Sequence, residues 1–381
     1  MQIDFHYYAT YSAAIIAGYS HEEALDIAYS AFLVDRCSES LLIKLGAPKI
    51  AATTQLQMEL MDANTDIMGL QNITRIWSSF HFLPKDLYVD KKKGWSKNYH
   101  NKYSLICGPN GSLVRATVEL AKDSTLQAIG VSMHVTADTW AHMYFAGTPS
   151  LAINNTNYYF YEIYPDGERK QINFRHNPIS PDDVEKGIYT SSIYQSNENN
   201  IMNLGHGRAG HLPDYSYCVY NYLPSWNEYC EVVKDNPSDF YNAYCQLIYA
   251  MKYIRGDVKE FQLDTYDYDA VSKYKDKIDV ILNTRKIDTC QEWKAFGEEI
   301  SGKEIPDFDE NKYQEEYMKA ENKSETFLGK FFNATIAQKS MVTQRIYESG
   351  NMLAGYSLTP DPVELATRTV KNSIKVGDIN D

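Results

Sequence analysis

Three side chains that can bind a metal recur at every fourth position from His134 to His142. They are His134, Asp138 and His142, and the residues around them predict one long helix. Because four residues advance an α-helix by about 400°, each side chain lies about 40° round from the last, and all three share one face. Two imidazoles and a carboxylate on one face can bind zinc or a similar divalent ion directly, at about 2 Å. The run therefore predicts a metal site; the alternative is a polar stripe in which each histidine bonds to a neighbour.

A glycine-rich stretch from residue 205 to residue 214 supplies a second set of candidates. His206, His211 and Asp214 are candidate metal ligands, and Arg208 carries a guanidinium that can clamp a phosphate. Three glycines in the stretch let the backbone approach a ligand closely. A surface loop with incidental histidines is the alternative, but two of the nine histidines of the chain fall in this short window. The stretch therefore favours a metal or phosphate site.

Four more candidate ligands lie near the N-terminus. Asp4 and His6 stand at the start of a helix predicted to end at residue 17. Asp35 falls on the inward face of a second helix, which opens with a capping box at Ser20. Burial of a carboxylate costs free energy unless it meets a cation, a hydrogen-bond donor or a metal. For Asp35 the alternative to metal binding is therefore a salt bridge. His81 lies between two aromatic residues, shortly before a proline. The alternative to metal binding is that His81 is a core histidine hydrogen-bonded to the backbone.

The composition narrows the function classes. The chain has 381 residues, 44% of them hydrophobic, which is typical of a globular protein. A net charge of −13 argues against general nucleic-acid binding, although a small phosphoester or lipid-like substrate in a metal-lined cleft fits. The six cysteines form no C-x-x-C pair, so neither a cysteine zinc site nor a disulfide framework is indicated. No leader peptide or transmembrane stretch is predicted, and we expect a cytoplasmic protein.

The periodicity predicts a mainly α fold with a small β insertion. Residues 1–255 form a helical metal-binding domain, interrupted at about residues 150–178 by a β-hairpin whose turn is Pro165–Glu168. Residues 256–381 form a helical C-terminal extension, which contains a helix from Ser324 to about Ser349. Every candidate ligand precedes residue 215. The last third is therefore expected to cover the core or to bind a protein partner.

The collected motifs resemble a family of bacterial proteins with an N-terminal Asp-Phe-His-Tyr-Tyr motif, here residues 4–8. The order of ligand types is in turn similar to the zinc-dependent phospholipase C and single-strand nuclease superfamily. That resemblance, over about residues 1–255, implies an α-helical phosphodiesterase fold of the phospholipase C type with a three-zinc cluster. Carried over by position, it implies metal ligands at Asp4, His6, Asp35, His81, His134, Asp138, His142, His206, His211 and Asp214.

The chain departs from that superfamily in two places. Secreted members bind a metal through the amine of a processed N-terminal tryptophan, whereas this chain starts with Met1, and His142 follows Asp138 more closely than is usual. The number of bound ions, one, two or three, therefore remains open. If the site is catalytic, Asp138 would bridge two ions and an activated water would attack phosphorus, while Arg208 or the lysine run at residues 91–97 would neutralise charge. An interaction protein with a structural metal is the alternative; an HD-type phosphohydrolase lacks its adjacent His-Asp pair.

Overall fold

The computed structural model describes residues 1–175, 181–192 and 197–356. The predicted mainly α architecture is confirmed. A π-helical turn, η1 (Asp4–Ala9), runs directly into the first α-helix. The α-helices in the described residues are α1 (Thr10–Ile16), α2 (His21–Leu33), α3 (Glu39–Leu45), α4 (Gln57–Ala63), α5 (Ile67–Phe80), α6 (Lys97–Tyr103), α7 (Ser112–Ala121), α8 (Leu126–Ala141), α9 (Leu151–Asn154), α10 (Asn236–Arg255), α11 (Tyr268–Val271), α12 (Lys275–Leu282), α13 (Cys290–Ser301), α14 (Gln314–Lys319) and α15 (Phe327–Glu348).

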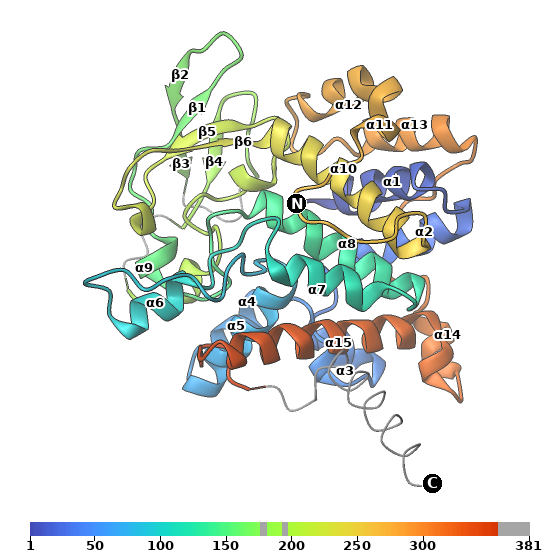
Figure 1. The fold of residues 1–381 in the computed structure, drawn as a ribbon, viewed down its shortest axis with the longest axis horizontal. Coiled ribbons are helices and arrows are strands. Elements are labelled where there is room, and N and C mark those ends of the chain that lie inside the picture. Colours follow the sequence, from blue (N-terminus) through green and yellow to red (C-terminus); the bar gives the residue numbers. More distant parts are fainter. Residues whose placement is uncertain (176–180, 193–196, 357–381) are drawn as a thin grey trace, which may run out of the picture.

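The strands gather in a β layer at one end of the molecule (Figure 1). The predicted hairpin is present as β1 (Tyr161–Ile163) and β2 (Arg169–Gln171), which pair antiparallel. Two later strands, β5 (Val219–Tyr222) and β6 (Val232–Asp235), complete an antiparallel sheet in the order β2-β1-β5-β6. The β layer therefore extends beyond the predicted insertion, because β1 needs β5 as its second neighbour. A separate parallel pair is formed by β3 (Asn173–Arg175) and β4 (Ile188–Thr190).

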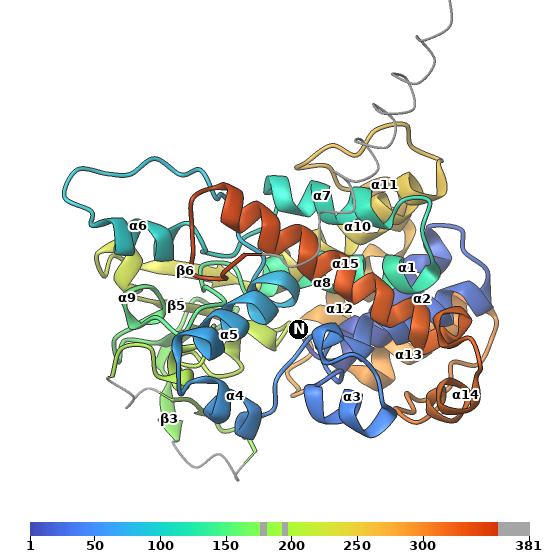
Figure 2. The same ribbon diagram turned by 90° about the horizontal axis from the view of Figure 1, so that it is seen from below.

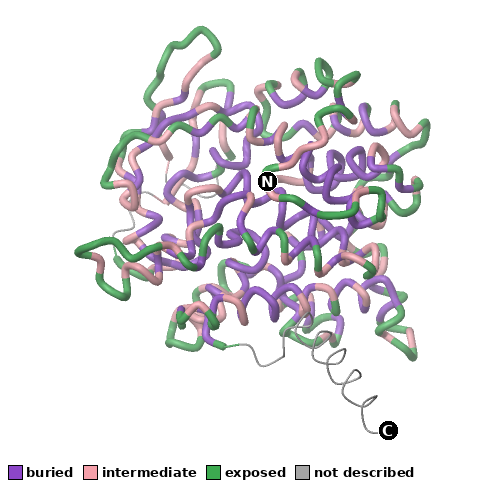
Figure 3. Tube along the Cα trace, in the orientation of Figure 1, coloured by how far each residue is buried: buried purple, intermediate pink, exposed green. Residues whose placement is uncertain are grey.

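Helix α8 lies at the centre of the helical part, packed against α2, α7, α10 and α15. Its N-terminus is capped by Thr125, whose hydroxyl accepts a hydrogen bond from the Ala128 amide. Almost every residue of α8 is buried, and the buried parts of the chain surround it in Figure 3. A helix buried all round can carry polar side chains only where these find partners. His134 and Asp138 are therefore fixed by their surroundings.

Two hydrophobic cores meet beside this helix. The larger contains residues from α1 and α2 together with residues from α13 and α15. The smaller lies under the sheet and includes Phe82, Phe145 and Tyr220, and Trp77 packs against both cores. The predicted boundary at residue 255 falls at the end of α10, and helices on both sides of it share the larger core. Residues 176–178 of the predicted insertion and 357–381 of the predicted extension lie outside the described residues.

The predicted helix ends agree in most places with the structure. The capping box at Ser20 is present, and Gly256 ends α10 with φ +91°, a conformation that glycine adopts without strain. The C-terminal helix α15 starts after Thr326, two residues later than the predicted start at Ser324. Within the described residues, no helix is both long enough and apolar enough to span a membrane.

Close packing of α2 against α8 gives a first test of this architecture. A Cβ atom added at Gly130 would lie 2.4 Å from the Ile27 carbonyl oxygen and 2.5 Å from the Ser30 Cβ. We expect Gly130→Val to lower the free energy of unfolding by about 2–3 kcal/mol, because the helices must separate. Denaturant unfolding measures this change. Ala128→Val is the matched control, since Ala128 lines a cavity of about 520 Å³ with room for two methyl groups. Equal stability of the two variants would contradict the packing.

Candidate metal centre

The prediction that His134 and Asp138 share one face of a helix is confirmed. The Nε2 atom of His134 lies 3.2 Å from Oδ2 of Asp138. His142 is the C-terminal cap of α8, and its Nδ1 lies 3.6 Å from the same oxygen. Asp138 is almost fully buried at this point, with both carboxylate oxygens in contact with other groups. It is the residue around which the centre is built.

A first group of ligand atoms surrounds Oδ2 of Asp138. Nδ1 of His81 and Nε2 of His134 each lie 3.2 Å from this oxygen and 3.3 Å from each other. Oδ1 of Asp35 lies 3.7 Å from the His81 nitrogen and 3.9 Å from the His134 nitrogen. Four atoms held about 2.0–2.1 Å from a tetrahedral ion are about 3.3–3.4 Å apart. The group therefore has the size and the donor set of a zinc site.

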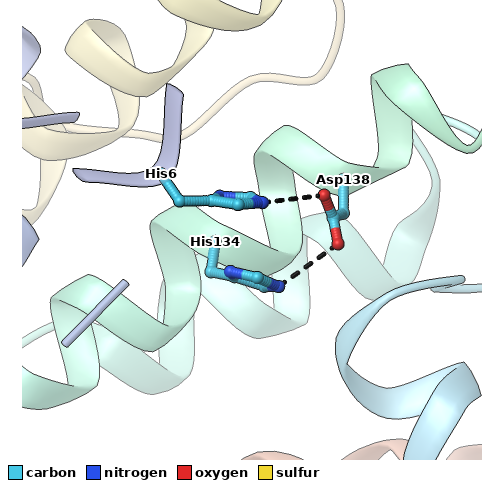
Figure 4. A group of neighbouring side chains, drawn as sticks. All are labelled: His6, His134 and Asp138. Atoms are coloured by element: carbon cyan, nitrogen blue, oxygen red, sulfur yellow. Dashed lines mark hydrogen bonds and ion pairs between the residues drawn. The ribbon is translucent and has the colours of Figure 1, made fainter. Parts of the chain in front are cut away.

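A second group forms at the other oxygen, Oδ1 of Asp138. Nε2 of His6, from the π-helical turn, lies 3.1 Å from it, and the Met1 amine lies 2.7 Å from it. The rings of His6 and His134 stack with their centroids 3.9 Å apart. Figure 4 shows the two rings side by side, each directed at a different oxygen of Asp138. One carboxylate thus separates two sets of ligands.

A third group lies where α8 ends and the glycine-rich stretch passes. Nε2 of His142 is 3.0 Å from Oδ1 of Asp214, and Nε2 of His206 is 3.4 Å from Oδ2. The Met1 amine is 3.2 Å from Oδ1 of Asp214 and 3.4 Å from the His142 nitrogen. The ring of His142 also stacks on Phe82, which belongs to the smaller core. Packing of the two hydrophobic cores therefore keeps the third group of ligand atoms next to the first and second groups.

Backbone carbonyls fix the protonation of three imidazoles. His81 donates from Nε2 to the Thr53 carbonyl at 3.1 Å, and His142 donates from Nδ1 to the His81 carbonyl at 2.6 Å. His206 donates from Nδ1 to the Gly210 carbonyl. A carbonyl only accepts, so in a neutral ring the remaining nitrogen carries a lone pair. In all three residues that nitrogen faces a carboxylate oxygen of Asp138 or Asp214.

Burial keeps two of the imidazoles uncharged. It lowers the pKa of His6 to about 4 and the pKa of His206 to about 4, from the ordinary value of 6.5. The neutral His206 ring then directs a lone pair at Asp214, a contact between two acceptors. Such a contact is repulsive unless a cation lies between the two atoms. Neutral imidazoles and ionised carboxylates are the forms that bind divalent metals.

The carboxylates of the centre are ionised for a complementary reason. Burial alone would raise the pKa of Asp138, but favourable electrostatic interactions with His142 and with the Met1 amine outweigh burial and hold that pKa well below its usual range. Asp214 behaves in the same way. Burial would lower the pKa of the Met1 amine, yet three aspartates raise it to about 11: Asp138, Asp214 and Asp35. The ionised aspartates thus give the buried centre a negative charge, which stabilises cations.

A cleft of about 610 Å³ leads from the surface to two ligands, Asp35 and Asp214. Its lining includes apolar side chains from the N-terminal segment and the end of α2, and polar side chains from the β layer and the glycine-rich stretch. The lining residues are Met1, Gln2, Ile3, Phe32, Asp35, Arg36, Pro181, Asp182, Thr190, His211, Asp214, Tyr215 and Ile287. A small substrate can therefore reach the first and third groups.

Eight predicted ligands lie in the three groups, and three other predicted site residues lie elsewhere. The carboxylate of Asp4 accepts hydrogen bonds from the backbone amide and the hydroxyl of Thr289, at 2.9 and 3.0 Å. His211 is at the rim of the third group, largely exposed, with Nδ1 3.3 Å from Asp214. Arg208 is buried, and burial lowers the pKa of its guanidinium. Its catalytic role stays a prediction.

Sequence reasoning missed the groups that orient the ligands. The carbonyls of Thr53 and Gly210 carry no residue-type signal, because every residue has a carbonyl. The Met1 amine was considered only through the resemblance. Met1 is followed within five residues by His6, and that proximity was the one available signal.

Comparisons with known proteins place the chain in a family. A match to "Family of unknown function (DUF6765)" covers residues 1–346, which is most of the chain. No curated protein and no solved structure matches the chain. The comparisons therefore assign no chemistry to this chain.

Proposed function

The chain belongs to DUF6765, a family of unknown function, and we propose that it is a metal-dependent hydrolase that cleaves phosphodiesters. The cofactor would be a divalent ion, most simply zinc, with one to three ions bound. One observation carries the proposal. Each oxygen of the buried Asp138 carboxylate faces its own set of potential ligand atoms, and in the neutral ring the His81 nitrogen that faces Asp138 is an acceptor, an arrangement that a bound cation would stabilise.

The residues of the centre have separate tasks in this proposal. His81, His134, Asp35 and Asp138 would hold one ion, and His6 and Asp138 a second. The third group would hold a further ion. When bound, such ions supply Lewis acidity towards a phosphoryl oxygen and lower the pKa of water. The carbonyls of Thr53, His81 and Gly210 keep the rings in the correct tautomer.

The order of ligand types supports a fold of the zinc-dependent phospholipase C type. An early histidine, an aspartate, a middle histidine, a His-x3-Asp helix and later histidines with a carboxylate converge on one place. That order is the one the resemblance implies for the superfamily. We therefore extend the proposal to this fold type.

A structural metal site in an interaction protein is the competing proposal. A structural zinc has four protein ligands and is closed to solvent, whereas a catalytic ion keeps an open position. Asp35 and Asp214 both line the cleft, so two of the groups are accessible from solution. Accessibility favours the hydrolase.

Hydrolysis of bis(p-nitrophenyl) phosphate by zinc-loaded protein tests the proposal. We expect turnover that chelator abolishes and zinc restores, and a loss of about a hundredfold or more in His134→Gln, since one ligand of the first group is removed. His21→Gln is the control, because His21 hydrogen-bonds Tyr11 outside the centre. Activity of His134→Gln equal to that of His21→Gln would reject the hydrolase, and metal binding without any turnover would favour the structural site.

A further inference from the structure

The loop between α12 and α13, residues 283–289, is anchored near both of its ends. On one side Arg285 pairs with Glu162 of β1, through Nη1 and through Nη2 at 3.0 Å. Its Nε also donates to the Val184 carbonyl at 2.8 Å. On the other side the amide and hydroxyl of Thr289 donate to Asp4. The loop therefore connects the β layer to the N-terminal segment, against which α13 also packs (Figure 2).

Both anchors are strong because their carboxylates are buried. Glu162 is 4% exposed and Asp4 is 7% exposed. A bidentate guanidinium–carboxylate pair fixes direction as well as distance. Tyr189 adds a hydrogen bond to Glu162 at 3.2 Å. Because Arg285 and Thr289 are fixed, the loop residues between them are held in place as well.

Ile287 lies between the anchors and lines the cleft. It is 39% exposed, although the rest of the loop is mainly polar. Two further apolar side chains, Ile3 and Phe32, line the same cleft. Thr190, Asp182 and His211 belong to the polar lining. Ile287 is an exposed isoleucine in a cleft that has other apolar side chains and candidate metal ligands. An apolar ligand that covers it removes apolar surface from water, which favours binding.

We propose that Ile287, with Ile3 and Phe32, forms a subsite for an aliphatic or other apolar organic group of the phosphoester. This inference rests on the proposed function. The phosphate would bind at the metal groups, and the organic group would contact the three apolar side chains that line the cleft. Ile287 is then a specificity-determining residue, which selects esters with carbon chains over small or fully polar ones. Each buried methylene would tighten binding by about threefold to fourfold.

Calorimetric binding of methyl, butyl and hexyl phosphate to the zinc-loaded full chain tests the subsite. In the wild type we expect affinity to rise with chain length, with hexyl phosphate bound at least about tenfold more tightly than methyl phosphate. Ile287→Ala should reduce that ratio about fivefold and leave methyl phosphate binding unchanged. Ile43→Ala is the matched control, because Ile43 is an exposed isoleucine of α3 that does not line the cleft.

The outcomes separate this inference from the phosphodiesterase proposal. A ratio near one in the wild type, no binding of any alkyl phosphate, or an unchanged ratio in Ile287→Ala would overturn the subsite. Equal weakening of methyl and hexyl phosphate in Ile287→Ala would also overturn it, because the residue would then act on the phosphate site. A chain-length dependence that requires Ile287, in a protein that hydrolyses no phosphodiester, would uphold the subsite and reject the phosphodiesterase.

Discussion

The Asp138→Asn variant is expected to bind at most one divalent ion and to lose at least about a thousandfold in phosphodiester hydrolysis. An asparagine offers one oxygen in place of two, and its amide nitrogen cannot bind a cation. Both the first and the second group therefore lose their shared ligand. Elemental analysis of the purified variant measures the metal content, and release of p-nitrophenol measures the rate.

The same substitution has a second consequence in the metal-free protein. The Met1 amine lies 2.7 Å from Asp138, and both groups are buried. Removal of one partner from a buried ion pair costs about 3–5 kcal/mol, which denaturant unfolding in chelator measures. Asp239→Asn breaks a different buried pair, with Lys234, and should destabilise the protein without loss of metal. Full metal content in Asp138→Asn would contradict the bridging role.

Metal-free protein is expected to lose stability as the pH falls from about 6.5 towards 4. The pKa values of His6 and His206 are lowered to about 4 in the folded state, against 6.5 ordinarily. In this window the unfolded chain binds more protons than the folded chain, so protonation favours unfolding. The stabilisation from the two neutral imidazoles is fully present above pH 6.5. By pH 4 each histidine lowers the free energy of unfolding by at most about 3 kcal/mol. The depressed pKa values of Asp138 and Asp214 extend the loss below their ordinary value of 3.8.

Unfolding free energies at pH 7.5, 6 and 5 check this dependence. The double variant His6→Gln, His206→Gln should show a flatter profile, because it lacks both titrating rings. His21→Gln should keep the wild-type profile, since His21 lies outside the centre. A wild-type protein whose stability is constant from pH 7.5 to pH 5 would show that the two imidazoles are protonated or solvated in the folded state.

Local chemistry was predictable from the sequence. The four-residue spacing of His134 and Asp138 placed both on one helix face, and the Ser20 capping box and the glycine at 256 marked real helix ends. The hairpin was recognisable from its turn residues. Each of these features depends on residues that are close in the chain, where spacing fixes geometry.

Features that depend on distant residues were not predictable in the same way. Asp4 hydrogen-bonds Thr289, 285 positions away, and the sheet depends on β5, which a hairpin signal does not include. The sequence does not predict α4 either, because its exposed Met58 and Met61 break the usual separation of apolar and polar faces. The convergence of Asp35 and His81 on α8 came from the resemblance, because spacing alone cannot join separate helices.

Metal stoichiometry of the purified, untagged protein, with the ions located by anomalous diffraction, tests the central claim most directly. We predict two or three equivalents of zinc or another divalent ion, each lying within about 2 Å of ligand atoms from one of the three groups, with Asp138 shared by two of them. A metal-free protein whose stability is indifferent to chelator, or ions bound away from Asp138, would contradict the account.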